Sequence, residues 1–286
     1  MVIADEGKDE KKIDVLFYFQ PYWRWNSDSM DFSISRSRTL ITADLPEGFS
    51  CFVEIEIIPT VQLIKAQLEY QFGNQKIIVG QQSNSFKFYN PPLHERILVQ
   101  YPLASLVPNF DDLGVTLLGS IGNVLNYRFS ILNGKGPNYK DDNKDKDAVV
   151  FVKFSPSNWF SMASCWQGGY QEWTKDIEEK YYRSGQWLQG EIRPFFHLLI
   201  QPTWVKRNDM DKEGWFILGL LQISSRDQLV ARYLKDINKE EELTLGAIFN
   251  FNKRMRFLPN IYFRKKLDDN YDIGIYLMAQ INISNE

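Results

Sequence analysis

The sequence predicts an all-β fold, a transmembrane antiparallel β-barrel of about sixteen strands with short periplasmic turns and longer extracellular loops. Three observations support this prediction. Apolar and polar residues alternate with a period of two along the whole chain. The alternating segments have about the length, ~9–11 residues, that crosses a bilayer at a tilt. The connections between them are alternately short and long, as at the two ends of an outer-membrane barrel.

Period-two alternation is clearest from Leu125 to Ile131, where the odd positions are Leu, Tyr, Phe and Ile and the even positions are Asn, Arg and Ser. The segments Cys51–Ile57 and Leu243–Phe251 alternate in the same way, and so does the last predicted strand. A helix would repeat its apolar positions every three to four residues, so helices are poor candidates for these segments.

The predicted strands are long beside the ~5–6 residues typical of soluble sheets. They lie at about 13–25, 31–43, 49–58, 62–72, 75–82, 112–121, 124–133, 146–154, 159–168, 183–193, 196–206, 214–223, 227–234, 241–251, 255–264 and 270–282.

Two sets of connections alternate between these strands. The short set is Phe72–Gln75, Ser120–Asn123, Pro156–Asn158 and Asn252–Arg254. The longer set is Ser83–Asp111, Gly134–Asp145, Gly169–Tyr182, Arg207–Glu213 and Lys235–Glu240. We therefore expect short turns at the periplasmic end and longer loops at the extracellular end. An even number of strands then returns both termini to the short-turn end.

Composition agrees with a barrel and argues against a helical membrane protein. Mean hydropathy is −0.35, and no segment approaches the about 20 apolar residues of a spanning helix. A barrel strand needs only alternate apolar residues. Aromatic residues make up 15% of the chain, and six tryptophans near strand ends suit interfacial girdles: Trp23, Trp25, Trp159, Trp166, Trp204 and Trp215. Because aromatic residues favour strands in general, girdles are one of two interpretations.

The remaining bulk features exclude several classes of partner. A net charge of −3 offers no basic footprint for nucleic acid. Cys51 and Cys165 are too few for a disulfide framework and too far apart to suggest a metal site, so we expect two free structural cysteines. No cofactor and no metal are expected.

The first twelve residues are polar, and we expect a disordered lead over 1–12 and a single barrel domain over 13–286. This lead lacks the basic start and apolar run of a secretory signal. Because an outer-membrane protein is exported with such a signal, the barrel prediction requires that the chain is a mature form with an added Met.

A family resemblance covers about residues 31–156. It is carried by Ser35–Arg38, Ile78–Gln81, Asp112–Gly119, Leu125–Gly136, Asp142–Asp147 and Phe154–Pro156. These segments resemble the phosphate-selective porin O and P family. The resemblance implies a sixteen-stranded channel in the outer membrane of a Gram-negative-type bacterium, surrounded by its lipid. It also implies a homotrimer, a loop folded into the lumen and a preference for small anions such as phosphate.

The chain departs from that family in three respects. It ends Ile281–Glu286 without a terminal aromatic residue, and the connection Ile58–Val61 is very short. No lysine cluster or arginine ladder can be aligned residue by residue. The resemblance therefore carries over a porin-like barrel and not phosphate specificity.

If the apolar faces meet lipid, the opposite faces line the lumen. Basic residues then point inward from several strands: Lys65, Lys76, Arg128, Lys153, Arg193, Lys206, Arg232 and Arg256. Acidic residues do so as well, at Glu54, Glu56, Glu69 and Glu191. Lysine and arginine rings select anions in channels. The alternative is that these charges only keep a wet pore solvated. The sequence does not assign a face to Arg36 or Arg38.

The connection Ser83–Asp111 is the best candidate for a constriction. It is far longer than an ordinary hairpin connection and rich in apolar residues, so it should pack against the barrel. Folded into the lumen, it would place Lys87, His94 and Arg96 at the narrowest point. Packing on the rim or at a trimer contact is the alternative.

The predicted function is that of an outer-membrane porin, passively conducting small hydrophilic solutes with a modest preference for anions. Two alternatives stay open: a closed or plugged barrel with a structural or adhesive role, and a soluble two-domain β protein that binds an apolar ligand. An enzyme is not predicted, because His94 and His197, the two histidines of the chain, suit structural or pore-lining positions. The acidic segment Asp141–Asp147 is interleaved with lysines and lacks a turn glycine, so it suits a solvated loop better than a calcium site.

Overall fold

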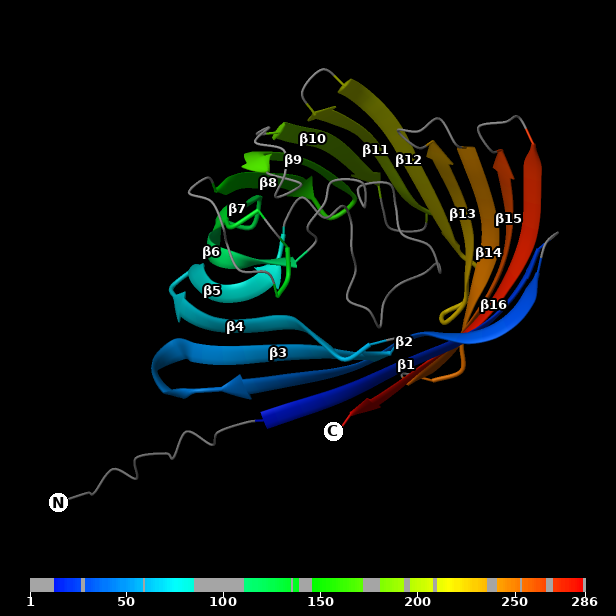
Figure 1. Ribbon diagram of the computed structural model, residues 1–286, viewed down its shortest axis with the longest axis horizontal. Helices are drawn as coiled ribbons and strands as arrows, with labels where there is room; N and C mark the ends of the chain where they lie inside the picture. The colour runs from blue at the N-terminus through cyan, green and yellow to red at the C-terminus, as the bar shows by residue number, and fades with distance from the viewer. Residues whose placement is uncertain are drawn as a thin grey trace, which may run out of the picture.

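In a computed structural model, the protein forms a closed β-barrel whose described part contains sixteen antiparallel strands (Figure 1). The structure describes residues 13–26, 29–58, 60–84, 111–134, 136–138, 146–171, 181–192, 196–207, 210–235, 241–252, 254–265 and 270–284. The predicted lead over 1–12 and most of the predicted constriction loop lie outside these residues. No helix among the described residues is long and apolar enough to cross a membrane.

The strands agree closely with those expected from the alternation pattern. They are β1 (Ile13–Asn26), β2 (Met30–Asp44), β3 (Phe49–Ile58), β4 (Gln62–Phe72), β5 (Gln75–Ser83), β6 (Asp111–Ile121), β7 (Leu125–Leu132), β8 (Asp147–Ser157), β9 (Phe160–Gln171), β10 (Tyr181–Ile192), β11 (Phe196–Arg207), β12 (Met210–Gln222), β13 (Gln228–Lys235), β14 (Glu241–Asn250), β15 (Met255–Lys265) and β16 (Tyr271–Ser284). A short 3₁₀ turn, η1 (Pro46–Gly48), joins β2 to β3. The predicted all-β barrel of about sixteen strands is confirmed.

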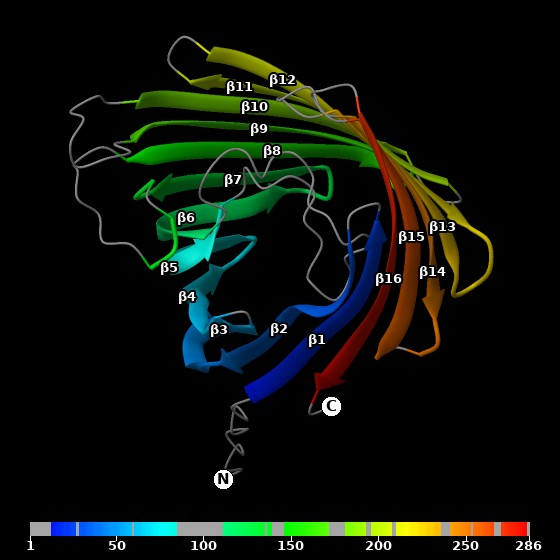
Figure 2. The same cartoon turned by 45° about the vertical axis from the view of Figure 1, so that its right-hand side comes forward.

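The barrel closes between its first and last strands. Each strand pairs with its neighbour in the chain, and β1 pairs with β16 from Leu16↔Ser284 to Asn26↔Gly274. Figure 2 shows β1 and β16 side by side. Closure leaves no sheet edge with unpaired backbone groups. The start of β1 and the end of β16 therefore lie at the same end of the barrel, as an even number of strands requires.

Short turns gather at that same end. They include η1, the turn at Gly73 and Asn74, and the turn from Gly122 to Val124. β5 ends at Ser83 and β6 begins at Asp111 at the other end, where the long connection starts and finishes. One predicted long loop is wrong: Arg207–Glu213 is short, because Met210–Glu213 belong to β12 and Arg207 pairs with Met210.

The two faces of the barrel wall differ in chemistry along many strands. On β6, Leu113 and Val115 point outward and are 48% and 51% exposed, whereas Thr116 points inward and is buried. On β7, Phe129 and Ile131 are exposed outside and Ser130 is buried inside. The period of two therefore produces an apolar outer wall, the arrangement of a barrel embedded in lipid.

Tryptophans are exposed on the outer wall at both ends of the barrel. Trp25 of β1, Trp204 of β11 and Trp215 of β12 lie towards the end with the long connection. Trp159 lies in the turn between β8 and β9, at the opposite end. These positions fit the interpretation of two interfacial girdles.

The wall is irregular where β1 to β4 lie side by side. The register shifts at Gln20/Pro21 between β1 and β2, at Ser37/Arg38 between β2 and β3, and at Glu54/Ile55 between β3 and β4. Such bulges bend a strand and re-aim the side chains beside it. Two charged residues of the candidate site, Arg38 and Glu54, lie at these register shifts.

Candidate functional site: the inner wall of the barrel

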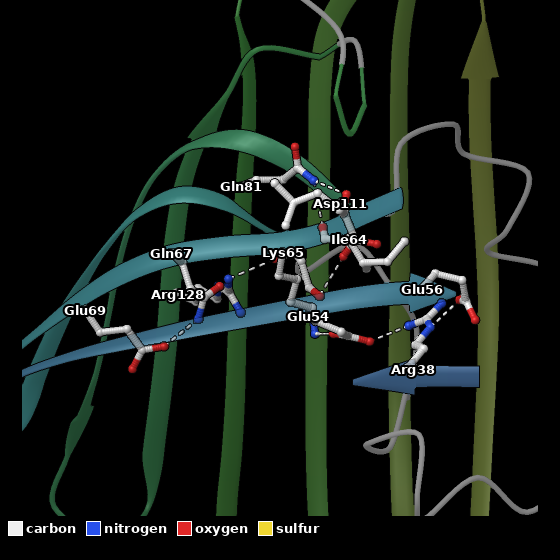
Figure 3. Close-up of polar contacts among 12 residues, drawn as sticks. Arg38, Glu54, Glu56, Ile64, Lys65, Gln67, Glu69, Gln81, Asp111 and Arg128 are labelled. Atoms are coloured by element: carbon white, nitrogen blue, oxygen red, sulfur yellow. Dashed lines mark hydrogen bonds and ion pairs between the residues drawn. The ribbon is translucent and has the colours of Figure 1, made fainter. Parts of the chain in front are cut away.

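A network of paired charges lines the inner wall over β2, β3 and β4 (Figure 3). The guanidinium of Arg38 donates to both Glu54 and Glu56, its neighbours across the strand pair. On the other side of β3, Lys65 Nζ lies 2.7 Å from Glu54 Oε2. Glu54 is only 1% exposed. Two cations and two carboxylates therefore neutralise one another here, as buried charges must.

A second pair continues this pattern on β4 and β5. Lys76 Nζ lies 2.5 Å from Glu69 Oε2. The amide of Gln67 donates to the other oxygen of the same carboxylate, Glu69 Oε1, at 2.5 Å. Lys76, which the sequence placed on the inner wall, is thus matched by an acidic partner. Because Glu69 neutralises it, the charge of Lys76 adds little to the positive potential of the lumen.

Arg128 on β7 is different, because its hydrogen bonds go to neutral oxygens. Its Nη2 donates to the backbone oxygen of Ser83 at 2.9 Å and to Gln82 Oε1 at 3.2 Å. Within the described part of the chain, no carboxylate forms an ion pair with this half-buried guanidinium. Arg128 therefore presents a positive charge on the inner wall that no contacting acid offsets.

A second charged cluster lies on the inner wall over β13, β14 and β15. Arg232 is 2% exposed and donates to Glu242 and, at 2.9 Å, to Thr244 Oγ1. Arg264 donates to Glu242 as well, from Nη2 at 2.7 Å. One carboxylate thus serves two arginines. Because Arg232 is almost fully enclosed, it cannot contact solutes directly.

The remaining predicted pore-lining residues fall into two groups. Lys153 is half-buried and pairs in register with Asn126 and Ala163, which places it on the inner wall. Arg256 donates from Nε to Gln280 Oε1 at 2.9 Å, also inside. The others lie outside the described residues or have side chains that are not described: Lys87, His94, Arg96, Arg193, Lys206 and Glu191.

Two features of the inner wall were not predicted. Arg38 could not be assigned to a face, because the register shift beside it breaks the simple alternation. The inner wall also carries an apolar cluster over β12 to β16, formed by Phe216, Leu218, Leu220, Val230, Ile248, Leu258 and Met278. The continuous apolar run from Trp215 to Leu221, interrupted only by Gly219, was the sequence signal for it, because it lacks a polar face.

The chain turns inward where β5 ends. Asn84 is buried, and its Nδ2 donates to Gln167 Oε1 on β9 at 2.9 Å, reaching past three intervening strands. Gln167 in turn donates to Asp147 Oδ2 on β8 at 2.7 Å. The beginning of the long β5–β6 connection is therefore tied to the inner wall.

Comparisons with known proteins agree on the fold. No family model and no curated protein matches the sequence. Among solved structures, the chain is similar to the outer membrane protein OmpT of Vibrio cholerae in a trimer form, with a TM-score of 0.75, 12% identity, and coverage of 96% of this chain and 100% of that one. It is also similar to an anion-selective porin from Comamonas acidovorans, with a TM-score of 0.73, 11% identity, and coverage of 96% of this chain and 100% of that one. A third similar structure is the outer membrane channel DcaP of Acinetobacter baumannii, with a TM-score of 0.67, 10% identity, and coverage of 99% of this chain and 100% of that one. These likenesses show a porin-type β-barrel fold.

Proposed function

We propose that the protein is a porin of the outer membrane of a Gram-negative-type bacterium, passively conducting small hydrophilic solutes. The observation that carries the proposal is the contrast between the two faces of one closed barrel. Outside, Val115 and its neighbours form an exposed apolar wall. Inside, charged residues such as Arg128 and Lys65 line the wall. A hydrated passage enclosed by a lipid-facing wall conducts solutes without catalysis.

A modest preference for anions is the finer part of this proposal. Three inner cations, Arg38, Lys65 and Lys76, are matched by carboxylates. Arg128 is matched only by neutral oxygens and adds a net positive charge to the wall. A fixed positive charge in a narrow aqueous path attracts anions and repels cations. The similar fold of an anion-selective porin points in the same direction. Phosphate is the first solute to test, because residues 31–156 resemble the phosphate-selective family.

Two further parts of the proposal concern the long connection and the assembly. We retain the lumen-folded constriction loop over 83–111 as a proposal, supported by the inward contact of Asn84 with Gln167. Lys87, His94 and Arg96 lie outside the described residues, and their place at a constriction is part of that proposal. A homotrimer is proposed because the similar barrel OmpT occurs in a trimer form.

The decisive experiment is single-channel recording from refolded protein in planar bilayers under a KCl gradient. We expect discrete conductance steps, with a reversal potential on the anion side, and inhibition of chloride current by added phosphate if phosphate is a solute. Heat-modifiable migration on gels provides the check that the barrel has refolded. Failure of a correctly refolded protein to insert into membranes would overturn the proposal in favour of a soluble β protein.

A closed barrel with a structural or adhesive role is the second candidate, and one observation favours it. Leu258 and Met278 face inward from β15 and β16 and are 0% exposed. Inner-wall residues that are fully covered leave no open passage beside them. A protein that inserts and migrates as a folded barrel but gives no steps would establish this second candidate.

A further inference from the structure

Gln82 is a fully buried amide that lies between the charged group of Arg128 and the backbone of β6. It is 0% exposed. Its Nε2 donates to the backbone oxygen of Gly114 at 3.1 Å. Since a carbonyl oxygen only accepts, this contact orients the amide so that Oε1 faces Arg128 Nη2, 3.2 Å away. The orientation of Gln82 is therefore determined on both sides.

The carboxylates near this pair are engaged elsewhere. Asp112, the cross-strand partner of Gln82, accepts from the backbone N–H groups of Leu113 at 2.8 Å and Gly134 at 2.6 Å. Glu69 interacts with Arg128 through space, but its oxygens accept hydrogen bonds from Lys76 and Gln67. Gln82 is thus the residue whose side chain contacts the guanidinium of Arg128.

Comparison with the other inner cations shows what this position controls. Arg38 contacts Glu54 and Glu56, and Arg264 contacts Glu242. In both cases the contacting side chain is a carboxylate. At Arg128 it is the amide of Gln82, just as Arg256 contacts the amide of Gln280. Glutamine and glutamate have nearly the same shape and differ by one charge. A single exchange at position 82 would therefore convert a charged site into a neutral pair with little change in side-chain size, although the carboxylate could no longer donate to Gly114.

We propose, as an extension of the porin proposal, that Gln82 is a specificity-determining residue: its neutrality keeps the charge of Arg128 uncompensated and so gives the channel its anion preference. Charges that are partly removed from water are screened weakly by salt. The effect of the guanidinium on passing ions therefore persists at the salt concentrations used in recordings. Gln82 itself need not touch the solute.

The test uses the wild-type channel and five variants. Gln82→Glu should lower the chloride-to-potassium permeability ratio severalfold, to about the value of Arg128→Gln, because both changes remove one net positive charge from this place. Gln82→Met removes both hydrogen bonds of the amide but no charge, and should retain the anion preference. Gln228→Glu adds the same charge as Gln82→Glu at the start of β13, beside a short turn, and is the control for added charge. The double variant Arg128→Gln/Gln82→Glu leaves a buried carboxylate without its cation. It should unfold at a lower urea concentration than the two single changes predict together.

The outcomes separate this proposal from the porin proposal on which it rests. A wild-type protein that forms no channels overturns the porin proposal itself. Channels whose selectivity is the same in wild type and Gln82→Glu, with Arg128→Gln clearly altered, overturn the role of Gln82 alone. Equal shifts in Gln82→Glu and Gln228→Glu also overturn it, because they would show that any added negative charge acts in the same way.

Discussion

The ring of Tyr262 on β15 lies against the backbone of Gly274, its cross-strand partner on β16. A Cβ atom at position 274 would overlap the ring atom Cε1 and the hydroxyl oxygen Oη of Tyr262. In this position Tyr262 Oη donates to Asp272 Oδ2 at 3.2 Å. Tyr127 and Gly119 repeat the arrangement on the outer wall, where a Cβ at Gly119 would lie 2.6 Å from Tyr127 Oη. The absence of a side chain at Gly274 is thus what allows the ring to lie across β16.

Gly274→Ala should destabilise the barrel by about 1–3 kcal/mol, because the added methyl group must displace the Tyr262 ring in a closely packed wall. The measurement is the urea midpoint of refolded protein in detergent. Replacing Tyr262 by Ala first should remove most of the effect of Gly274→Ala, since the two residues are in contact. Equal effects of Gly274→Ala with and without the Tyr262 ring would contradict the packing argument.

Glu242 holds two arginines, and the loss of its charge should be more harmful than the loss of either arginine. Glu242→Gln removes the carboxylate that contacts Arg232, which is 2% exposed. Breaking a buried pair in this way costs about 3–5 kcal/mol. Arg232→Met removes one cation, but Glu242 keeps Arg264 at 2.7 Å. We therefore expect Glu242→Gln to have the lower urea midpoint. A lower urea midpoint for Arg232→Met than for Glu242→Gln would show that the ion pair with Arg264 does not stabilise the buried Glu242 carboxylate.

The fold could be predicted from sequence because each strand of a closed barrel repeats the same alternation of outward apolar and inward polar residues. Each strand has one face to lipid, so Leu125–Leu132 and Phe49–Ile58 show their alternation directly. The rule weakens where the inner wall is apolar. On β12, the residues Trp215 and Phe216 are both apolar although they face opposite sides. The start of that strand was placed at Gly214 rather than Met210 because the charged segment Arg207–Glu213 was interpreted as a loop.

The candidate site was less accessible to sequence analysis, because charge pairing depends on which strands are neighbours. Alternation assigned Lys65 and Arg232 to the inner wall, but their carboxylate partners emerge only from the register of β3 with β4 and of β13 with β14. Alternation cannot distinguish a paired cation from one such as Arg128. The face of Arg38 could be assigned only from the register between β2 and β3, which shifts beside it.

Arg128 and Arg232 should affect ion selectivity differently, although each carries one positive charge on the inner wall. Arg128→Gln removes a half-buried charge that contacts only neutral oxygens and should shift the reversal potential towards the cation side. Arg232→Met removes a charge that is 2% exposed and in contact with Glu242, and should shift the reversal potential less than Arg128→Gln does. Heat-modifiable migration verifies that both variants are folded. Indistinguishable shifts would mean that total wall charge, and not the contact environment, determines selectivity.

The lipid-facing wall can be tested without any channel recording. Val115 lies near the middle of β6 and points outward, 51% exposed, and Ile121 points outward at the short-turn end of the same strand, 64% exposed. Arginine on the lipid face costs about 2–4 kcal/mol at the middle of the bilayer and about 0–1 kcal/mol near its surface. Val115→Arg should therefore reduce the yield of folding into lipid vesicles strongly, whereas Ile121→Arg should fold nearly as well as wild type. In a soluble β protein both positions would face water, and neither arginine would impair folding. Equal and high yields for the two variants would thus contradict a membrane-embedded wall, because only lipid makes the depth of the substitution matter.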